Sequence, residues 1–131
     1  MVCLETSFII DVIRGEEQVS EIEKQLDKGS EAITVAAPTV MELVKGAELS
    51  NKPKSEKEKV HNFLSSLIIL NLDKESAMLA GEIEAELRKK GEIIQIEDIM
   101  IGAIAKHNSE TLITRNKKHF ERITNLEIET Y

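Results

Sequence analysis

The chain has 131 residues, 24 acidic and 17 basic, and its formal net charge of −7 argues against a general nucleic-acid coat protein with a basic face. Cys3 is the only cysteine, which excludes an internal disulfide and a cysteine–zinc site. We expect it to be a small buried apolar residue. There is no signal-peptide pattern and no apolar run near the roughly 20 residues of a membrane helix. We therefore expect one soluble, cytoplasmic domain covering residues 1–131.

Amphipathic helices alternate with short apolar strands along the first half of the chain. Residues 7–14 and 16–28 read as helices, each followed by a glycine. In residues 39–49 apolar side chains recur at helical spacing, which predicts a helix with one face on the core. Short apolar, β-branched runs predict strands at residues 2–4 and 32–37.

The same alternation continues in the second half. We expect one helix to end near residue 67, another to run from the cap residue Asp73 to just before Gly91, and a very apolar, buried helix at residues 97–107. Strands are expected at residues 68–72, 111–114 and 126–129. This order predicts an α/β fold of three layers, with a central, mostly parallel sheet of four to five short strands flanked by helices.

Polar side chains follow the predicted strands at their carboxyl ends, where open α/β sheets bind ligands. Glu5 follows the first strand, Glu42 lies early in the helix after the second, and Asp98 opens the apolar helix. Asn116 comes just after the fourth strand. If strands one, two and four are neighbours, these groups meet at one rim, and a hard divalent cation, Mg²⁺ or Mn²⁺, would relieve their repulsion. Metal held in this way is typical of phosphodiester hydrolysis.

Four segments resemble the motifs of PIN domains, as found in the VapC toxins of type II toxin–antitoxin pairs. Residues 4–11 resemble the opening motif, residues 39–46 and 97–105 the second and third acidic motifs, and residues 111–120 the closing motif. The four occur in the family's order and at its spacing. The resemblance implies a PIN-like fold, cleavage of RNA with Mg²⁺ or Mn²⁺, an antitoxin partner and a homodimer.

The resemblance also implies roles for individual residues. The catalytic, metal-binding carboxylates would be Glu5, Glu42 and Asp98, and the catalytic set would be completed by Asn116. Supporting hydrogen bonds would come from Thr6, Ser7 and Thr114.

Glu5 departs from the family pattern, which ordinarily has aspartate as its first acid. The extra methylene lengthens the side chain by about 1.5 Å. Active-site groups generally tolerate only about 0.5 Å of misplacement. We therefore expect a site that binds metal but cleaves RNA less well than an aspartate version.

The remaining charged residues have weaker signals. A basic cluster after the fourth strand either holds RNA phosphates or forms only a solvated face; its members are Arg115, Lys117, Lys118 and Arg122. Asp11 is expected on a solvated helix face, outside the site. No metal-ligand spacing or catalytic base is indicated by the three histidines, His61, His107 and His119.

Each candidate site residue also has a purely structural explanation. Glu42 ends a capping box that starts at Thr39. Asp98 suits the positive end of a helix, and Glu5 could be an ordinary surface acid. Asn116 could cap the short helix that follows it.

Other functions stay open at this point. A phosphate-accepting receiver domain would need an aspartate acceptor that ends a middle strand, whereas Asp73 begins a helix. A PIN-like domain that binds RNA or protein without cutting is kept open by Glu5, and an RNA-processing nuclease without an antitoxin would carry the same motifs. The sequence does not indicate which RNA is cut. For a dimer surface, the exposed faces of the helices that contain Val60 and Ile83 are candidates.

Overall fold

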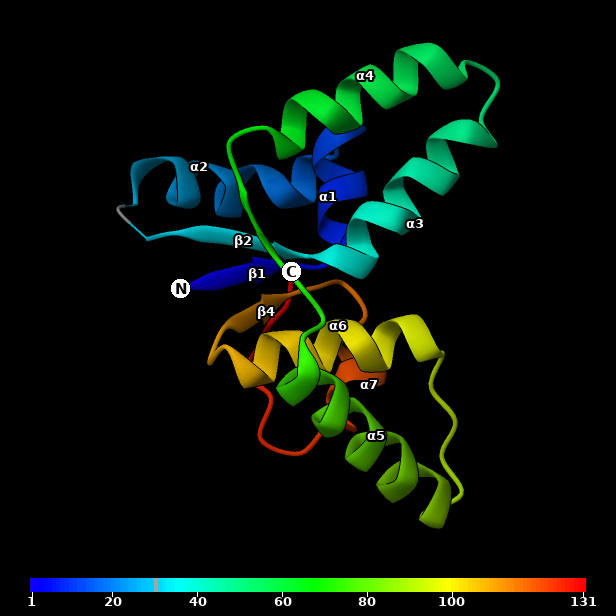
Figure 1. The fold of residues 1–131 in the computed structure, drawn as a ribbon. Coiled ribbons are helices and arrows are strands. Elements are labelled where there is room, and N and C mark those ends of the chain that lie inside the picture. Colours follow the sequence, from blue (N-terminus) through cyan, green and yellow to red (C-terminus); the bar gives the residue numbers. More distant parts are fainter. Residues whose placement is uncertain (30) are drawn as a thin grey trace.

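The computed structural model describes residues 1–29 and 31–131. Its centre is a five-stranded sheet in the order β3-β2-β1-β4-β5, with every neighbouring pair parallel (Figure 1). The strands are β1 (Val2–Leu4), β2 (Ile33–Ala36), β3 (Ile68–Leu70), β4 (Thr111–Ile113) and β5 (Ile128–Glu129). The predicted α/β fold with a parallel sheet is therefore confirmed.

The central position of β1 follows from its composition. All three of its residues are buried, and alternate side chains point to opposite faces. Cys3 packs into the core on one face, while Val2 and Leu4 belong to the core on the other. The strand pairs with β2 on one side and β4 on the other, so the predicted adjacency of strands one, two and four is confirmed.

Helices cover both faces of the sheet (Figure 1). On one face lie α1 (Thr6–Ile13), the 3₁₀ turn η1 (Glu17–Val19), α2 (Ser20–Lys28), α3 (Ala37–Glu48) and α4 (Pro53–Leu64). On the other lie α5 (Lys74–Lys89), α6 (Ile96–His107) and the short α7 (Lys117–Phe120). The helices of Val60 and Ile83 thus lie on opposite faces, and both side chains are buried.

The prediction for α6 is confirmed, since six of its residues are buried. Gly102 allows it to pack closely, because a Cβ atom there would meet the Ile123 side chain inside normal contact distance. Asp73 caps α5 as expected, in a reciprocal pair of hydrogen bonds with Ser76.

Some predicted boundaries are wrong. The expected helix at residues 16–28 is divided into η1 and α2, with Val19 buried at the junction. Helix α3 starts at Ala37, directly after β2 and before the predicted start at residue 39, so that Pro38 lies in its first turn. Proline is tolerated there because the first helical N–H groups have no partner within the helix.

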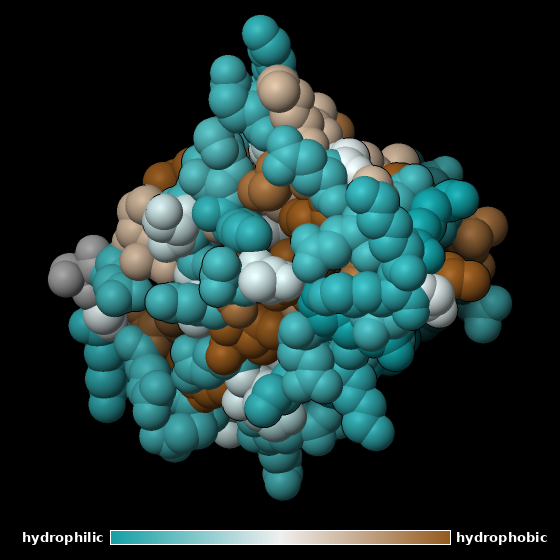
Figure 2. Space-filling view, turned by 90° about the horizontal axis from the view of Figure 1, so that it is seen from below, coloured by the Kyte–Doolittle hydropathy of each residue, from teal (hydrophilic) through white to brown (hydrophobic). Residues whose placement is uncertain are grey.

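Figure 2 shows a largely hydrophilic face of the molecule with apolar areas between hydrophilic residues. Along the edge at β3, apolar side chains are exposed, Ile68 by 52% and Ile69 by 39%. Among the described residues, no helix combines the length and apolar character needed to cross a membrane.

Candidate active site

The carboxyl ends of β1, β2 and β4 form one rim of the sheet. Glu5 directly follows β1, and its backbone N–H donates to the carbonyl of Ile113 at the end of β4, at 3.0 Å. Thr114 directly follows β4. Helix α3 leaves β2 without a connecting loop, so its first turns, including Glu42, start from the same rim.

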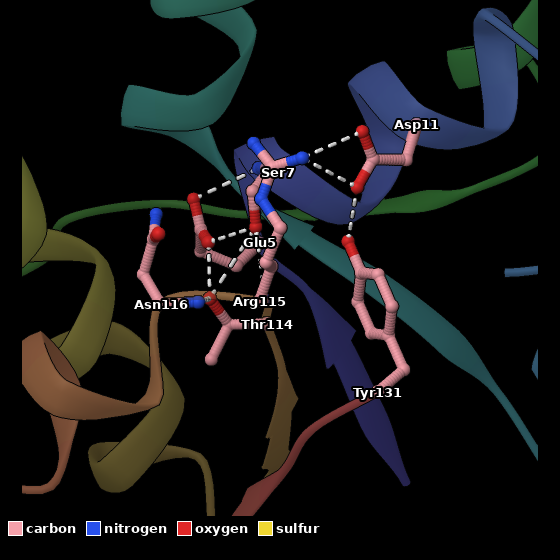
Figure 3. Close-up of polar contacts among 7 residues, drawn as sticks. All are labelled: Glu5, Ser7, Asp11, Thr114, Arg115, Asn116 and Tyr131. Atoms are coloured by element: carbon pink, nitrogen blue, oxygen red, sulfur yellow. Dashed lines mark hydrogen bonds and ion pairs between the residues drawn. The ribbon is translucent and has the colours of Figure 1, made fainter. Parts of the chain in front are cut away.

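Glu5 is buried, with an exposed fraction of 2%, so the reading as an ordinary surface acid is wrong. It is the N-cap residue of α1 and accepts from the Ser7 N–H at 3.0 Å and the Ser7 hydroxyl at 2.7 Å. The hydroxyl of Thr114 donates to the same carboxylate (Figure 3). Two of the predicted supporting residues therefore contact this acid, one from α1 and one from the end of β4.

Glu42 is half-buried and accepts a hydrogen bond from the Thr6 hydroxyl at 2.6 Å. The capping box proposed for it does not form, because α3 begins earlier and its N-cap residue is Ala36, with no side-chain cap. Thr39 instead lies with its hydroxyl 3.2 Å from that of Thr6. The structural explanation of Glu42 is therefore wrong, and its carboxylate belongs to the rim.

Asp98 lies in the first turn of α6, as predicted, and its side chain is only 13% exposed. Its Oδ2 atom lies 3.5 Å from Nδ1 of His119 on α7. No sequence spacing pointed to this histidine, because the contact joins two helices.

The charges of the three acids affect one another. Burial raises the pKa of Glu42, and the negative charges of Asp98 and Glu5 raise it further. Burial also raises the pKa of Asp98, and the charge of Glu5 adds to that rise. Mutual effects of this kind mean that the rim concentrates negative charge which nearby cations do not fully balance.

A divalent cation suits this set of donors. Carboxylate oxygens are the ligands that Mg²⁺ and Mn²⁺ prefer, and a cation would lower the electrostatic cost just described. Across the part of the chain that the structure describes, no three His, Cys, Asp or Glu side chains are yet gathered closely enough to hold an ion. The acids bind separate neighbours instead: Glu5 the hydroxyls of Ser7 and Thr114, Glu42 that of Thr6, and Asp98 the ring of His119.

Asn116 is half-buried beside this rim, and its backbone N–H donates to the Thr114 hydroxyl at 2.9 Å. It occupies the N-cap position of α7 but makes no side-chain cap, so the capping explanation is wrong. Of the predicted RNA-binding residues, Lys117 and Lys118 are exposed at the start of α7. The guanidinium of Arg115 is held by Asp11, with both Nη1–Oδ distances 3.0 Å.

The prediction for Asp11 is wrong: it is buried, with an exposed fraction of 1%. Besides Arg115, it accepts a hydrogen bond from the Tyr131 hydroxyl at 2.7 Å (Figure 3). One signal was available in the sequence, because Asp11 follows Ser7 by four residues and therefore shares its helix face. Both partners lie more than 100 residues away, at the other end of the chain.

Glu110 is a second buried acid that the sequence did not reveal. It precedes β4, at the opposite end of that strand from Thr114, and its exposed fraction is 2%. Neither carboxylate oxygen has a hydrogen-bond partner among the described residues. Burial raises the pKa of this carboxyl, and its distance from the rim along the strand separates it from the other acids.

Comparisons with known proteins match the sequence and the fold of this chain to a family. A family model described as "PIN domain" matches residues 2–126. "Ribonuclease VapC2" of Haemophilus influenzae is 34% identical over 128 residues, 98% of this chain and 96% of that protein. The "tRNA(fMet)-specific endonuclease VapC" of Salmonella typhimurium is 31% identical over the same shares. In structure, the chain is similar to VapBC2 from Rickettsia felis bound to a DNA fragment from their promoter, with a TM-score of 0.91, 30% identity, and 100% of this chain and 99% of that chain covered.

Proposed function

Because the chain belongs to the PIN-domain family, in its group of VapC-type ribonucleases, we propose that it is a divalent-metal-dependent endoribonuclease, the toxin of a toxin–antitoxin pair. PIN-domain ribonucleases generally depend on a divalent metal. In this chain the ion would be Mg²⁺ or Mn²⁺, held by Glu5, Glu42 and Asp98. The observation that supports this most directly is the geometry of the rim, where Glu5 follows β1, Glu42 lies on the helix that leaves β2, and Asp98 lies in the first turn of α6. Burial raises the pKa of Glu42, and the charges of Asp98 and Glu5 raise it further.

In the proposed reaction the metal ion and the protein side chains have different roles. When bound, the ion would activate a water molecule and stabilise the oxyanions of the phosphodiester displacement. Thr6 fixes Glu42, while Ser7 and Thr114 fix Glu5, each through its hydroxyl. Asn116, whose side chain makes no helix cap, would orient the substrate or the attacking water. The exposed lysines Lys117 and Lys118 would hold RNA phosphates beside the rim.

The partners follow from the same family membership. We propose that residues 1–131 act as one PIN-like domain whose activity a cognate antitoxin blocks. We also propose a homodimer, which the exposed apolar side chains at the β3 edge, Ile68 and Ile69, and at Met78 on α5 favour. Sedimentation of the purified protein tests the dimer, and co-expression with a short neighbouring reading frame tests the antitoxin.

A cleavage assay tests the nuclease itself. The substrate is an initiator tRNA transcript, chosen because the Salmonella relative is named for that RNA, with an unrelated structured RNA alongside. Cleavage should require Mn²⁺ or Mg²⁺, stop with a chelator, and disappear in Asp98→Asn. The matched control is Asp27→Asn, which neutralises an exposed aspartate on α2 and should cut normally.

RNA binding without cleavage would favour the other function that the sequence left open, a PIN-like domain that binds but does not cut. Glu5 already accepts three hydrogen bonds, which is the observation that favours a domain that binds without cutting. A wild-type protein that takes up Mn²⁺ and binds RNA but cuts no substrate would overturn the nuclease proposal.

A further inference from the structure

We propose that Asp11 and Tyr131 are positioning residues of the ribonuclease site and act through Arg115. This inference rests on the proposed function. It concerns a cluster built on the buried carboxylate of Asp11, Asp11–Arg115–Tyr131, that contributes no residue to the proposed set of metal ligands. The cluster joins α1, the loop after β4 and the last residue of the sequence (Figure 3).

Asp11 is almost completely buried and is held by two partners. A carboxylate that is 1% exposed needs charge and hydrogen-bond partners to remain there. Nη1 of Arg115 lies 3.0 Å from each carboxylate oxygen, and the Tyr131 hydroxyl donates to Oδ2 at 2.7 Å. These contacts fix one end of the arginine side chain although the side chain as a whole is 49% exposed.

The backbone of Arg115 connects this cluster to Glu5. The Arg115 N–H donates to the Ser7 hydroxyl at 3.1 Å, and that hydroxyl donates to Glu5 at 2.7 Å. The residues on either side of Arg115 belong to the same rim: Thr114 donates to Glu5 and accepts from the Asn116 N–H. Fixing Arg115 therefore helps to fix its two neighbours, Thr114 against Glu5 and the Asn116 N–H against the Thr114 hydroxyl.

The donors and acceptors of the Ser7 and Thr114 hydroxyls are consistent with these contacts. Ser7 and Thr114 each donate their single hydroxyl proton to Glu5 and each accept a backbone N–H, from Arg115 and Asn116 respectively. The two hydroxyls also lie 3.4 Å apart, where either could donate to the other, but the shorter contact of each is with Glu5. In Figure 3 Asn116 lies on one side of Glu5, and Asp11 and Tyr131 lie on the other.

Tyr131 extends the cluster to the end of the sequence. Its ring packs edge-to-face on Phe8, with centroids 5.5 Å apart. Burial raises its pKa, so its hydroxyl stays protonated and remains a donor to Asp11. Phe8 and Asp11 are both on α1, so the tyrosine braces the helix that Glu5 caps.

A double-mutant cycle tests the proposal. Steady-state kinetics of Mn²⁺-dependent cleavage are measured for Asp11→Asn, Arg115→Gln and the double variant. Asp11→Asn should lower kcat about tenfold, with KM within about twofold of wild type. If Asp11 acts through Arg115, the double variant should be no slower than Arg115→Gln alone. Glu48→Gln, which removes an acid from the exposed pair with Lys57, is the matched control and should be unchanged.

The outcomes separate this inference from the proposed function. The inference is overturned if kcat of Asp11→Asn equals that of wild type. It is also overturned if the fold-loss of kcat in the double variant is the product of the fold-losses in the two single variants. Neither result affects the proposed nuclease function. A wild-type protein that does not cut overturns the proposed function itself. If Asp11→Asn fails to fold in a urea titration, Tyr131→Phe decides, because it keeps the ring on Phe8 and removes only the hydroxyl. Its kcat should fall, and an unchanged kcat overturns the inference.

Discussion

Nδ1 of His119 lies 3.5 Å from Oδ2 of Asp98, joining α7 to the first turn of α6. The two residues belong to different helices, and only the histidine is well exposed, by 53% against 13% for the aspartate. A protonated histidine ring would lower the pKa of this aspartate and so oppose the effect of burial. In the proposed enzyme it would also compete with the metal ion for the same carboxylate.

The first prediction follows from that competition. The contact with the ring lowers the pKa of Asp98, so removal of the ring should leave this carboxylate free for the ion. We expect His119→Ala to bind Mn²⁺ more tightly than wild type, as measured by calorimetry. His61→Ala, which changes an exposed histidine on α4, is the control. Unchanged or weaker Mn²⁺ binding in His119→Ala would contradict the explanation.

The second prediction concerns Glu42 in metal-free protein. Its folded pKa is raised, so its charge destabilises the fold at pH values above the ordinary value of about 4.3. Glu42→Gln keeps an oxygen for Thr6 and should raise the free energy of unfolding in chelator by up to about 1 kcal/mol at pH 7, while cleavage is lost. The gain should shrink as the pH falls from the raised folded value towards about 4.3, and it should vanish below that, where the wild-type carboxyl is protonated in both states. Urea titrations at the two pH values measure it, and a variant less stable at pH 7 would contradict the argument.

The third prediction concerns the length of the Glu5 side chain. Glu5→Asp withdraws the carboxylate by about 1.5 Å. We expect it to raise Mn²⁺ affinity and the rate of RNA cleavage, because the shorter acid restores the residue that this family ordinarily carries. The hydrogen bond from Thr114 should weaken at the same time. Calorimetry and cleavage kinetics that are both unchanged would show that the extra methylene has no consequence.

The sequence predicted the frame of the site well because local patterns determine it. Short apolar strands alternating with helices specify a parallel sheet, and the carboxyl ends of such strands meet. Glu5, Glu42 and Asp98 were selected as candidates in this way, and the resemblance to PIN domains assigned them their roles. The buried helix α6 was equally readable, because its apolar residues surround it on most sides.

Interactions between distant segments could not be read in the same way. Asp11 looked like a solvated helix residue because its two partners, Arg115 and Tyr131, are 104 and 120 positions away. The capping box at Glu42 was a sound local motif with Thr39 as its N-cap, but the N-cap residue of α3 is Ala36, three residues earlier. In both cases tertiary contacts outweighed a local preference.

The fourth prediction concerns Glu110, which is buried with no partner for its carboxylate among the described residues. Its folded pKa is raised, so wild-type stability should fall as the pH rises from about 4.3 through the folded value. Glu110→Met, of similar size, should stabilise the protein by about 1–2 kcal/mol at pH 7, as measured in urea. Glu121→Met, at an exposed site, is the control for adding an apolar side chain. A destabilised Glu110→Met would indicate a partner that the carboxylate needs.

The fifth prediction concerns the single thiol. Cys3 is fully buried in β1, and burial raises its pKa to about 11. The thiolate, which is the reactive form, is therefore scarce in the folded protein. We expect no reaction with a thiol reagent at neutral pH in native buffer and complete reaction in urea. Rapid labelling of the native protein would show that β1 opens readily.

The pairing of β1 with β4 has a consequence for synthesis. Val2 is paired with Thr111, so β1 completes its pairing only after a segment more than 100 positions further along the chain has been made. Chains fold progressively as they emerge, yet a nascent chain without that segment lacks Thr114, which donates to Glu5, and Asn116, whose N–H donates to Thr114. The growing chain therefore acquires a complete site only after β4 and the residues that directly follow it have been made.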